Sequence, residues 1–156
     1  MKNLIFILTL ALLPVDMNAQ YDGATPWEYC FGKNASCGYV GCSDIEVITS
    51  SSSPVVAIVK KNGKVIKHAY IEKNSSYTFE IPDGRYQVYF YYGEYWDASK
   101  KMQSDECSSL YGGFTKNERV TKDDPIVLKG QIMSYTLRSI TGGNFSPKSS
   151  DLSEAL

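Results

Sequence analysis

Residues 55–71 read VVAIVKKNGKVIKHAYI, and this stretch decides the fold. Its centre, Asn62-Gly63, is the strongest short-range signal for a β-hairpin, because a two-residue turn of this type needs positive φ at both positions. The apolar, β-branched runs on either side have the composition of strands. The sequence therefore predicts a hairpin with strands at 55–60 and 65–71.

The turn also sets the register of this hairpin. Counting outward from it places Ala57 opposite His68, with Val55 and Val59 on the same face. The opposite face is half charged, so the face of Ala57 is the expected core. His68, the only histidine, is expected to be a neutral core residue and not a catalytic one, since no second group is placed to act with it.

Strand signals continue on both sides of the hairpin. Pro82-Asp83-Gly84 has turn chemistry, since Pro sets φ and Gly supplies a left-handed residue. Tyrosine is abundant, at 12 of 156 residues, and no long stretch has helical periodicity. We expect an all-β fold, an antiparallel β-sandwich of the immunoglobulin-like or prealbumin-like kind with seven to eight strands. The further strands are expected at 45–48, 77–81, 85–92, 114–120, 126–129 and 131–140.

The first 19 residues have the pattern of a secretory signal peptide, with Lys2, the apolar run 4–13 and a cleavage point after Ala19. The run is shorter than the roughly 20 apolar residues of a membrane-spanning helix, and no second such run follows. The chain is therefore expected to be exported, to the periplasm or the extracellular medium. The expected organisation is a signal peptide at 1–19, a Cys-rich segment at 20–43, a β-sandwich at 44–140 with a long 93–113 loop, and a flexible tail at 141–156.

Four cysteines, Cys30, Cys37, Cys42 and Cys107, are expected to form two disulfides in an oxidising compartment. Three pairings are possible, and in each of them Cys107 bonds to one of the other three. The amino-terminal segment should therefore be tied to the 93–113 loop. Of the three pairings we favour Cys30–Cys37 with Cys42–Cys107. The spacing does not match a zinc ribbon and one histidine leaves zinc short of ligands, so no metal or other cofactor is expected.

An aromatic run fills the strand expected at 85–92 and continues past it. By alternation, Tyr89 and Tyr91 point away from the core, and Tyr95 and Trp96 follow at the end of the strand. Outward rings of this kind stack on sugars or anchor a protein partner. The alternative is that they cover the sheet edge or pack under the 93–113 loop. Tyr89, Tyr91, Tyr95 and Trp96 are the expected ligand-binding residues.

A formal net charge of −1 implies neither nucleic acid nor an anionic membrane surface as a partner. No nucleophile elbow, phosphate-binding Gly-rich loop or calcium loop occurs. The sequence favours a non-catalytic binding or structural module whose partner is a glycan or an envelope protein. An inhibitor or a subunit of a cell-surface assembly is one alternative. The other is a small secreted hydrolase with its acid and base among Glu94, Asp97, Asp105 and Glu106.

Two resemblances accompany these predictions. Val55–Val59, the Asn62-Gly63 turn and the segment Tyr77–Tyr86 resemble carboxypeptidase-regulatory or prealbumin-like β-sandwich modules over about a quarter of the chain, which implies a non-catalytic role in adhesion, binding or spacing. A larger part, roughly 26–138, resembles a group of small secreted β-proteins of Bacteroidetes-type bacteria and implies no activity. The second resemblance lies in Pro26-Trp27, Cys30, Cys37, Gly41-Cys42-Ser43, His68-Ala69-Tyr70-Ile71, Phe90-Tyr91-Tyr92-Gly93, Gly112-Gly113-Phe114 and Tyr135-Thr136-Leu137.

Overall fold

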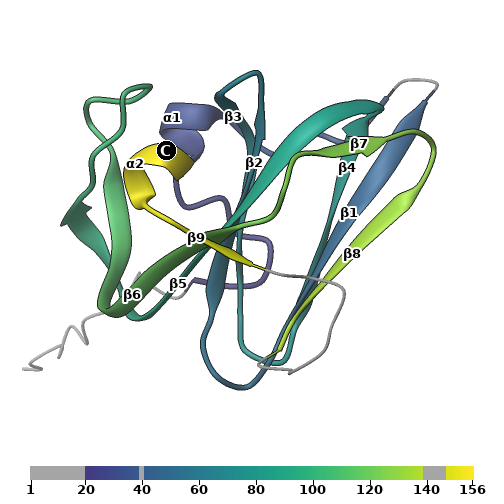
Figure 1. Ribbon diagram of the computed structural model, residues 1–156. Helices are drawn as coiled ribbons and strands as arrows, with labels where there is room; N and C mark the ends of the chain where they lie inside the picture. Colours follow the sequence, from purple (N-terminus) through teal and green to yellow (C-terminus); the bar gives the residue numbers. More distant parts are fainter. Residues whose placement is uncertain (1–19, 39–40, 139–146) are drawn as a thin grey trace, which may run out of the picture.

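The structure, a computed structural model, describes residues 20–38, 41–138 and 147–156. Within these ranges the chain forms nine strands and two four-residue helices (Figure 1). The strands form two sheets that pack face to face. The prediction of an all-β, disulfide-bonded fold is confirmed. The expected signal peptide at 1–19 lies outside the described residues.

The smaller sheet has three strands in the order β4-β1-β8. Its central strand is antiparallel to β4 but parallel to β8. The prediction of a purely antiparallel arrangement is therefore wrong for the β1–β8 pair. The two strands run in the same direction because the chain reaches β8 from the larger sheet and not through a hairpin from β1. The bounds of these strands are Cys42–Thr49 for β1, Ser76–Pro82 for β4 and Ile132–Leu137 for β8.

The larger sheet has the order β3-β2-β5-β6-β9, and the short strand β7 pairs with the start of β5. The bounds of these strands are Val55–Lys61 for β2, Lys64–Ile71 for β3, Gly84–Lys101 for β5, Tyr111–Lys122 for β6, Ile126–Leu128 for β7 and Lys148–Ser150 for β9.

Much of the predicted 93–113 loop is strand. β5 runs on to Lys101 and pairs with β6, so that only residues 102–110 connect the two strands. The register of this pair shifts between Tyr92 and Glu94 and again between Asp97 and Lys101. Such irregularities break the apolar–polar alternation that reveals a strand in the sequence.

The hairpin turns at Asn62-Gly63 as predicted, with positive φ at both residues. A β-bulge near the turn shifts the register by one residue, so that His68 pairs with Ile58 and not with Ala57. Because side chains alternate, this shift moves His68 to the opposite face of the sheet. His68 is buried as predicted, but the predicted face is wrong, because counting outward from Asn62-Gly63 assumes a register without a bulge.

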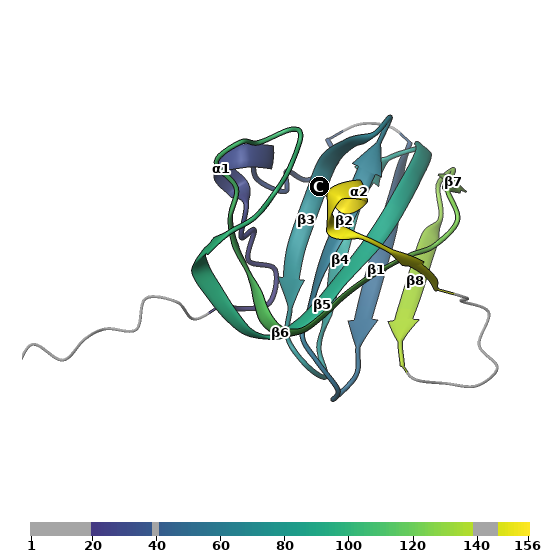
Figure 2. The same cartoon turned by 60° about the vertical axis from the view of Figure 1, so that its left-hand side comes forward.

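The larger sheet is buried on both faces. The inner face, which includes Val55, Ala57 and Val59, packs against the smaller sheet in one cluster. The outer face, which includes Val56 and Ile58, is covered by α1 (Glu28–Phe31), the 102–110 connection and α2 (Leu152–Ala155), as Figure 2 shows. We call the second set the outer cluster; its buried members are Ala24, Trp27, Val56, Ile58, Val65, Tyr70, Tyr89, Tyr91, Met102, Leu110, Phe114, Val120, Ala155 and Leu156.

The prediction of a loose tail is wrong for residues 147–156, whereas 139–146 lie outside the described residues. β9 extends the larger sheet beside β6, and α2 follows it. The side chain of Asp151 caps α2 by accepting a hydrogen bond from the Glu154 N–H at 2.9 Å. Ala155 and Leu156 are buried in the outer cluster. Only a few apolar residues stand at the end of this Ser-rich, charged segment. They are too few for the sequence to predict that the segment docks on the outer cluster.

The amino-terminal segment covers the outer edge of β3. The Gly23 N–H donates to the Tyr70 carbonyl at 2.9 Å, and the Tyr70 N–H donates to the Ala24 carbonyl at 2.8 Å. Further along, the Asn34 side chain donates to the His68 carbonyl at 2.8 Å and accepts from the His68 N–H at 3.2 Å. This segment satisfies backbone groups that an unpaired edge strand would leave open.

Candidate functional site

Two disulfides hold the amino-terminal segment against the sheets. Cys30 bonds to Cys107, and Cys37 bonds to Cys42. The prediction that Cys107 is tied to the amino-terminal trio is confirmed, whereas the favoured pairing of Cys30 with Cys37 is wrong. Cys30 and Cys107 both pack against the outer cluster, while Cys42 begins β1 in the other sheet. Cys42 therefore lies on the wrong side of the molecule to reach Cys107.

A groove of about 340 Å³ lies where α1 meets the β5–β6 hairpin. Its two tyrosines are well exposed: the exposed fraction is 60% for Tyr29 and 44% for Tyr111. Trp96 is half-buried beside them. We call this site the aromatic groove; its lining residues are Gln20, Pro26, Tyr29, Trp96, Ala98, Tyr111 and Gly112.

The two exposed tyrosines are held by each other. The Tyr29 hydroxyl donates to the Tyr111 carbonyl at 3.1 Å and accepts a hydrogen bond from the Tyr111 N–H. Tyr29 belongs to α1. The next residue in this helix, Cys30, forms a disulfide with Cys107 in the connection that leads into β6. A disulfide and two hydrogen bonds thus fix the position of the Tyr29 ring relative to Tyr111.

Trp96 is supported from behind by three aromatic residues. Its ring centroid lies 6.1 Å from that of Trp27, 5.9 Å from that of Tyr70 and 5.3 Å from that of Phe114. Two of these contacts are edge-to-face, a geometry that aromatic pairs favour. A Cβ at Gly112 would lie 2.9 Å from the Trp96 ring, and φ of Gly112 is +100°. Both facts favour glycine at this wall of the groove.

Trp27 anchors the amino-terminal segment to the outer cluster. Its side chain is fully buried, and its Nε1–H donates to the Gly112 carbonyl at 2.8 Å. Its backbone N–H donates to Nε2 of His68 at 3.0 Å, and the two rings stack with centroids 5.6 Å apart. Trp27 therefore connects the groove wall at Gly112 with the buried histidine.

His68 is a structural residue, neutral in the folded protein. Because Nε2 accepts a hydrogen bond from Trp27, the ring proton sits on Nδ1, to which no described residue offers a well-formed hydrogen bond. Burial lowers the pKa of His68 to about 4, although the charge of Glu28 and the backbone of Thr25 act to raise it. A ring with one nitrogen occupied and no acidic partner is poorly suited to acid–base catalysis.

The buried histidine predicts a loss of stability in mild acid. The unfolded chain protonates His68 near pH 6.5, whereas the folded chain resists until about pH 4. The free energy of unfolding should therefore fall by about 3 kcal/mol as the pH drops through this window. Urea unfolding at pH 7 and pH 4 measures this effect. A His68→Gln variant should lose most of the pH dependence, and an equally steep loss in that variant would assign it to other groups.

Of the four residues predicted to bind a ligand, two are buried. Both point away from the inner core as predicted, but Tyr91 is 1% exposed and Tyr89 is 5% exposed, so the prediction that a ligand can reach them is wrong. The Tyr91 hydroxyl donates to Glu118 at 2.5 Å and accepts from the Phe114 N–H at 2.9 Å. Burial is the main cause that raises the pKa of Tyr91 above its usual value. Burial is also the main cause that raises the pKa of Tyr89 to about 12. Both belong to the outer cluster, because this face of β5 is covered by α1 and α2.

The other two predicted residues are separated by the fold. Trp96 lines the aromatic groove, whereas Tyr95 does not and is 70% exposed. Tyr95 has φ of +55°, and the Lys116 ammonium lies 5.7 Å from the centre of its ring. Sequence reasoning missed Tyr29 and Tyr111. The position of Tyr29 next to a disulfide cysteine was the available signal.

The carboxyl groups of the hydrolase hypothesis have separate surroundings. Glu94 accepts from the Asn117 amide at 3.1 Å, and Asp97 accepts from the hydroxyl and the N–H of Ser99 in the same strand, which lowers the pKa of Asp97. Glu106 binds the start of β3, and Asp105 is exposed. Among the described residues, no group of three or more His, Cys, Asp or Glu side chains is placed to hold a metal ion.

The fold and the groove define a disulfide-bonded, two-sheet β protein with a small aromatic surface site. No protein-family model matches the chain, and neither curated proteins nor solved structures give a significant match. In the part of the chain that the structure describes, no helix has the length and apolar character needed to cross a membrane. The groove is therefore the feature of the molecule that bears on its function.

Proposed function

We propose that this protein is an exported, non-catalytic β-sandwich module that binds a glycan in the aromatic groove. The observation that carries the proposal is the pair of exposed rings, Tyr29 and Tyr111, held in place beside Trp96. Aromatic rings combine a large apolar face with a polar edge. This combination suits a sugar ring, which presents C–H groups on its faces and hydroxyls around its rim.

The groove is built before a ligand arrives. Tyr29 is fixed through Cys30–Cys107 and its bonds to Tyr111, and Trp96 is packed on three other rings. Side chains that are already ordered lose little conformational entropy on binding. Pre-organisation of this kind supports a recognition role for the tyrosines, because burial does not account for their order.

The size of the groove favours a small ligand. Its volume of about 340 Å³ is at the lower end of the roughly 300–1,000 Å³ of small-molecule sites. A stable protein complex usually buries about 800 Å² on each partner, which the rings around this groove would not supply alone. One or two sugar units are therefore the proposed occupant.

Export and topology are parts of the same proposal. Disulfides persist in oxidising compartments, and the start of the chain has the pattern of a signal peptide. We also propose that the two sheets form a sandwich of the immunoglobulin-like or prealbumin-like kind, which suits a non-catalytic module. Three carboxyl groups of the hydrolase alternative, those of Glu94, Asp97 and Glu106, bind separate partners and lend that alternative no support.

The proposal predicts that Tyr111→Ala weakens glycan binding by about fivefold, because an aromatic contact is worth about 1 kcal/mol. Tryptophan fluorescence, titrated with a panel of neutral polysaccharides, reports binding next to Trp96. Tyr95→Ala is the matched control, since Tyr95 is more exposed than Tyr111 yet lies outside the groove. It should bind as the unmodified protein does.

A flat fluorescence response across the panel would contradict glycan binding. Gel filtration with envelope extract then tests the remaining alternative, an inhibitor or assembly subunit. Co-elution with one protein that Tyr111→Ala abolishes would assign the groove to a protein partner. Equal losses in Tyr111→Ala and Tyr95→Ala would show that the groove is not the site.

A further inference from the structure

A second pocket, of about 420 Å³, lies between the β2–β3 turn, the start of β5 and α2. It is separate from the aromatic groove and shares no lining residue with it. Its lining includes two cations, Lys60 and Arg85, and one carboxylate, that of Glu154. The partners of these three groups decide what the pocket attracts.

Lys60 is a buried cation that hydrogen-bonds to a backbone carbonyl. The residue is 8% exposed, and its ammonium donates to the backbone carbonyl of Glu154 at 2.8 Å. The ammonium also lies 5.9 Å from the centre of the Tyr89 ring. Within the described ranges, no carboxylate comes within ion-pair distance of it. A buried ammonium with one neutral acceptor keeps donors that a ligand can use.

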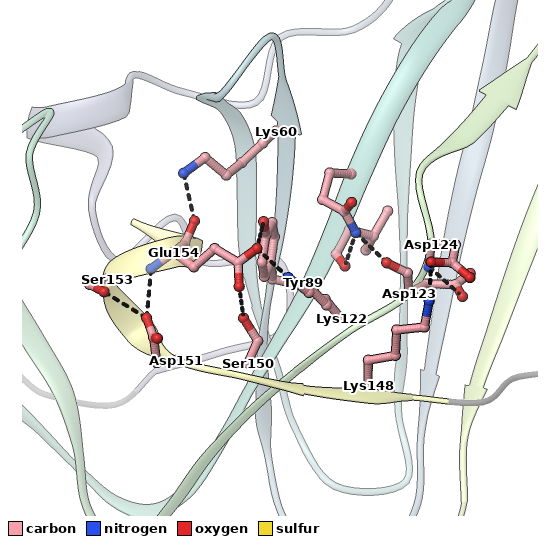
Figure 3. Close-up of polar contacts among 12 residues, drawn as sticks. Lys60, Tyr89, Lys122, Asp123, Asp124, Lys148, Ser150, Asp151, Ser153 and Glu154 are labelled. Atoms are coloured by element: carbon pink, nitrogen blue, oxygen red, sulfur yellow. Dashed lines mark hydrogen bonds and ion pairs between the residues drawn. The ribbon is translucent and has the colours of Figure 1, made fainter.

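The carboxylate of Glu154 is already occupied. Figure 3 shows it turned toward Ser150 and Lys122, while Lys60 reaches the backbone carbonyl of the same residue. The Ser150 hydroxyl donates at 2.6 Å, Tyr89 donates at 3.3 Å, and Lys122 forms an ion pair with it. The hydrogen bond from Lys122 is the main cause that lowers the pKa of Glu154. Because Lys122 neutralises Glu154, the unbalanced charge of the pocket is positive.

Arg85 adds a second cation without a described partner. It is exposed, and no carboxylate in the described part of the chain lies within ion-pair distance of it. Lys61 is close by, with its ammonium 5.2 Å from the centre of the Tyr86 ring. A guanidinium presents several N–H groups in a fixed plane, and an ammonium is a compact charge. Together they suit a group with several anionic oxygens.

We propose that this pocket binds an oxyanion group, a sulfate or phosphate ester, with Lys60 at its buried side and Arg85 at its exposed side. The oxyanion supplies the buried ammonium with a negative partner that the described part of the chain does not supply. The proposal is independent of glycan binding in the aromatic groove, because the two sites share no residue.

Amide NMR titrations with inorganic sulfate and inorganic phosphate, at ionic strength held constant with sodium chloride, test the proposal. Saturable shifts are expected in residues 60–64 and 85–87. Arg85→Gln should weaken the affinity by about tenfold, since a hydrogen bond to a charged group is worth about 1.5 kcal/mol or more. Lys60→Gln should have a similar effect. Lys64→Gln is the matched control, an exposed cation of the same hairpin that does not line the pocket.

Arg85→Gln decides the test if Lys60→Gln fails to fold, because Arg85 is exposed. Shifts that stay linear with anion concentration, or an equal loss in Lys64→Gln, would show general charge screening and overturn the proposal. A saturable response to acetate with none to sulfate or phosphate would also overturn it. Preference for sulfate or for phosphate distinguishes the two ester sources.

Discussion

Replacing Cys30 and Cys107 together by alanine is expected to lower the free energy of unfolding by about 4 kcal/mol. The two cysteines are 77 residues apart, and a crosslink over so long a loop removes much of the entropy of the unfolded chain. The loss should be measured by urea unfolding of the oxidised protein. The same variant should bind more weakly at the aromatic groove, since Tyr29 would no longer be held against Tyr111.

The second disulfide provides the matched control. Cys37 and Cys42 are five residues apart, so the chain-entropy argument gives about 2 kcal/mol for their removal. Replacing both by alanine should also leave the affinity at the groove unchanged, because neither residue supports its walls. If the two double variants lost equal stability, loop length would not be the source of the stabilisation.

Trp27→Ala is expected to lower the free energy of unfolding by about 3–5 kcal/mol. Trp27 is fully buried and stacks on His68 with its ring also 6.4 Å from that of Tyr91, so its removal opens a cavity in the outer cluster. Urea unfolding followed by circular dichroism measures the loss. The Trp96 side of the groove should also become less ordered, because Trp27 is one of its supports.

Trp27→Phe separates packing from hydrogen bonding. Phenylalanine keeps most of the apolar contact but leaves the buried Gly112 carbonyl without the Nε1–H donor. We expect a smaller loss, about 1–3 kcal/mol, from the unpaired carbonyl. A loss below about 1 kcal/mol in Trp27→Ala would mean that the amino-terminal segment adds little to the stability of the outer cluster.

The strands of the inner core could be predicted from the sequence, because one buried face leaves a clear alternation. β1 and the turn at Asn62-Gly63 are examples. The register of the β2–β3 pair could not be predicted, because one bulge places His68 on the opposite face of the sheet. Bulges are set by how a pair of strands packs and twists, and neither is visible in one strand's own pattern.

The outer cluster was missed for a different reason. Val56, Ile58 and Lys60 share a face that looked half charged, yet Lys60 is buried and its ammonium donates to the carbonyl of Glu154. The elements that cover this face are two helices of four residues, too short to have a helical period. Their docking depends on contacts between residues far apart in the chain.

The candidate site was predicted only in part. Trp96 lines the groove as expected, but Tyr29 and Tyr111 are brought together by a disulfide whose pairing the sequence left open. Tyr89 and Tyr91 have the right chemistry but are covered by other parts of the chain. Alternation distinguishes the two faces of a strand, and it does not say whether both faces are buried.

The amino-terminal segment along β3 also bears on aggregation. An open strand edge is a template to which a strand of another molecule can add. Here hydrogen bonds with Gly23, Ala24 and Asn34 occupy that edge, and the disulfides of Cys30 and Cys37 keep the segment in place. Reducing agents would release the segment and leave the backbone of β3 open to such addition. The oxidised protein keeps this route to fibrous or amorphous aggregates closed.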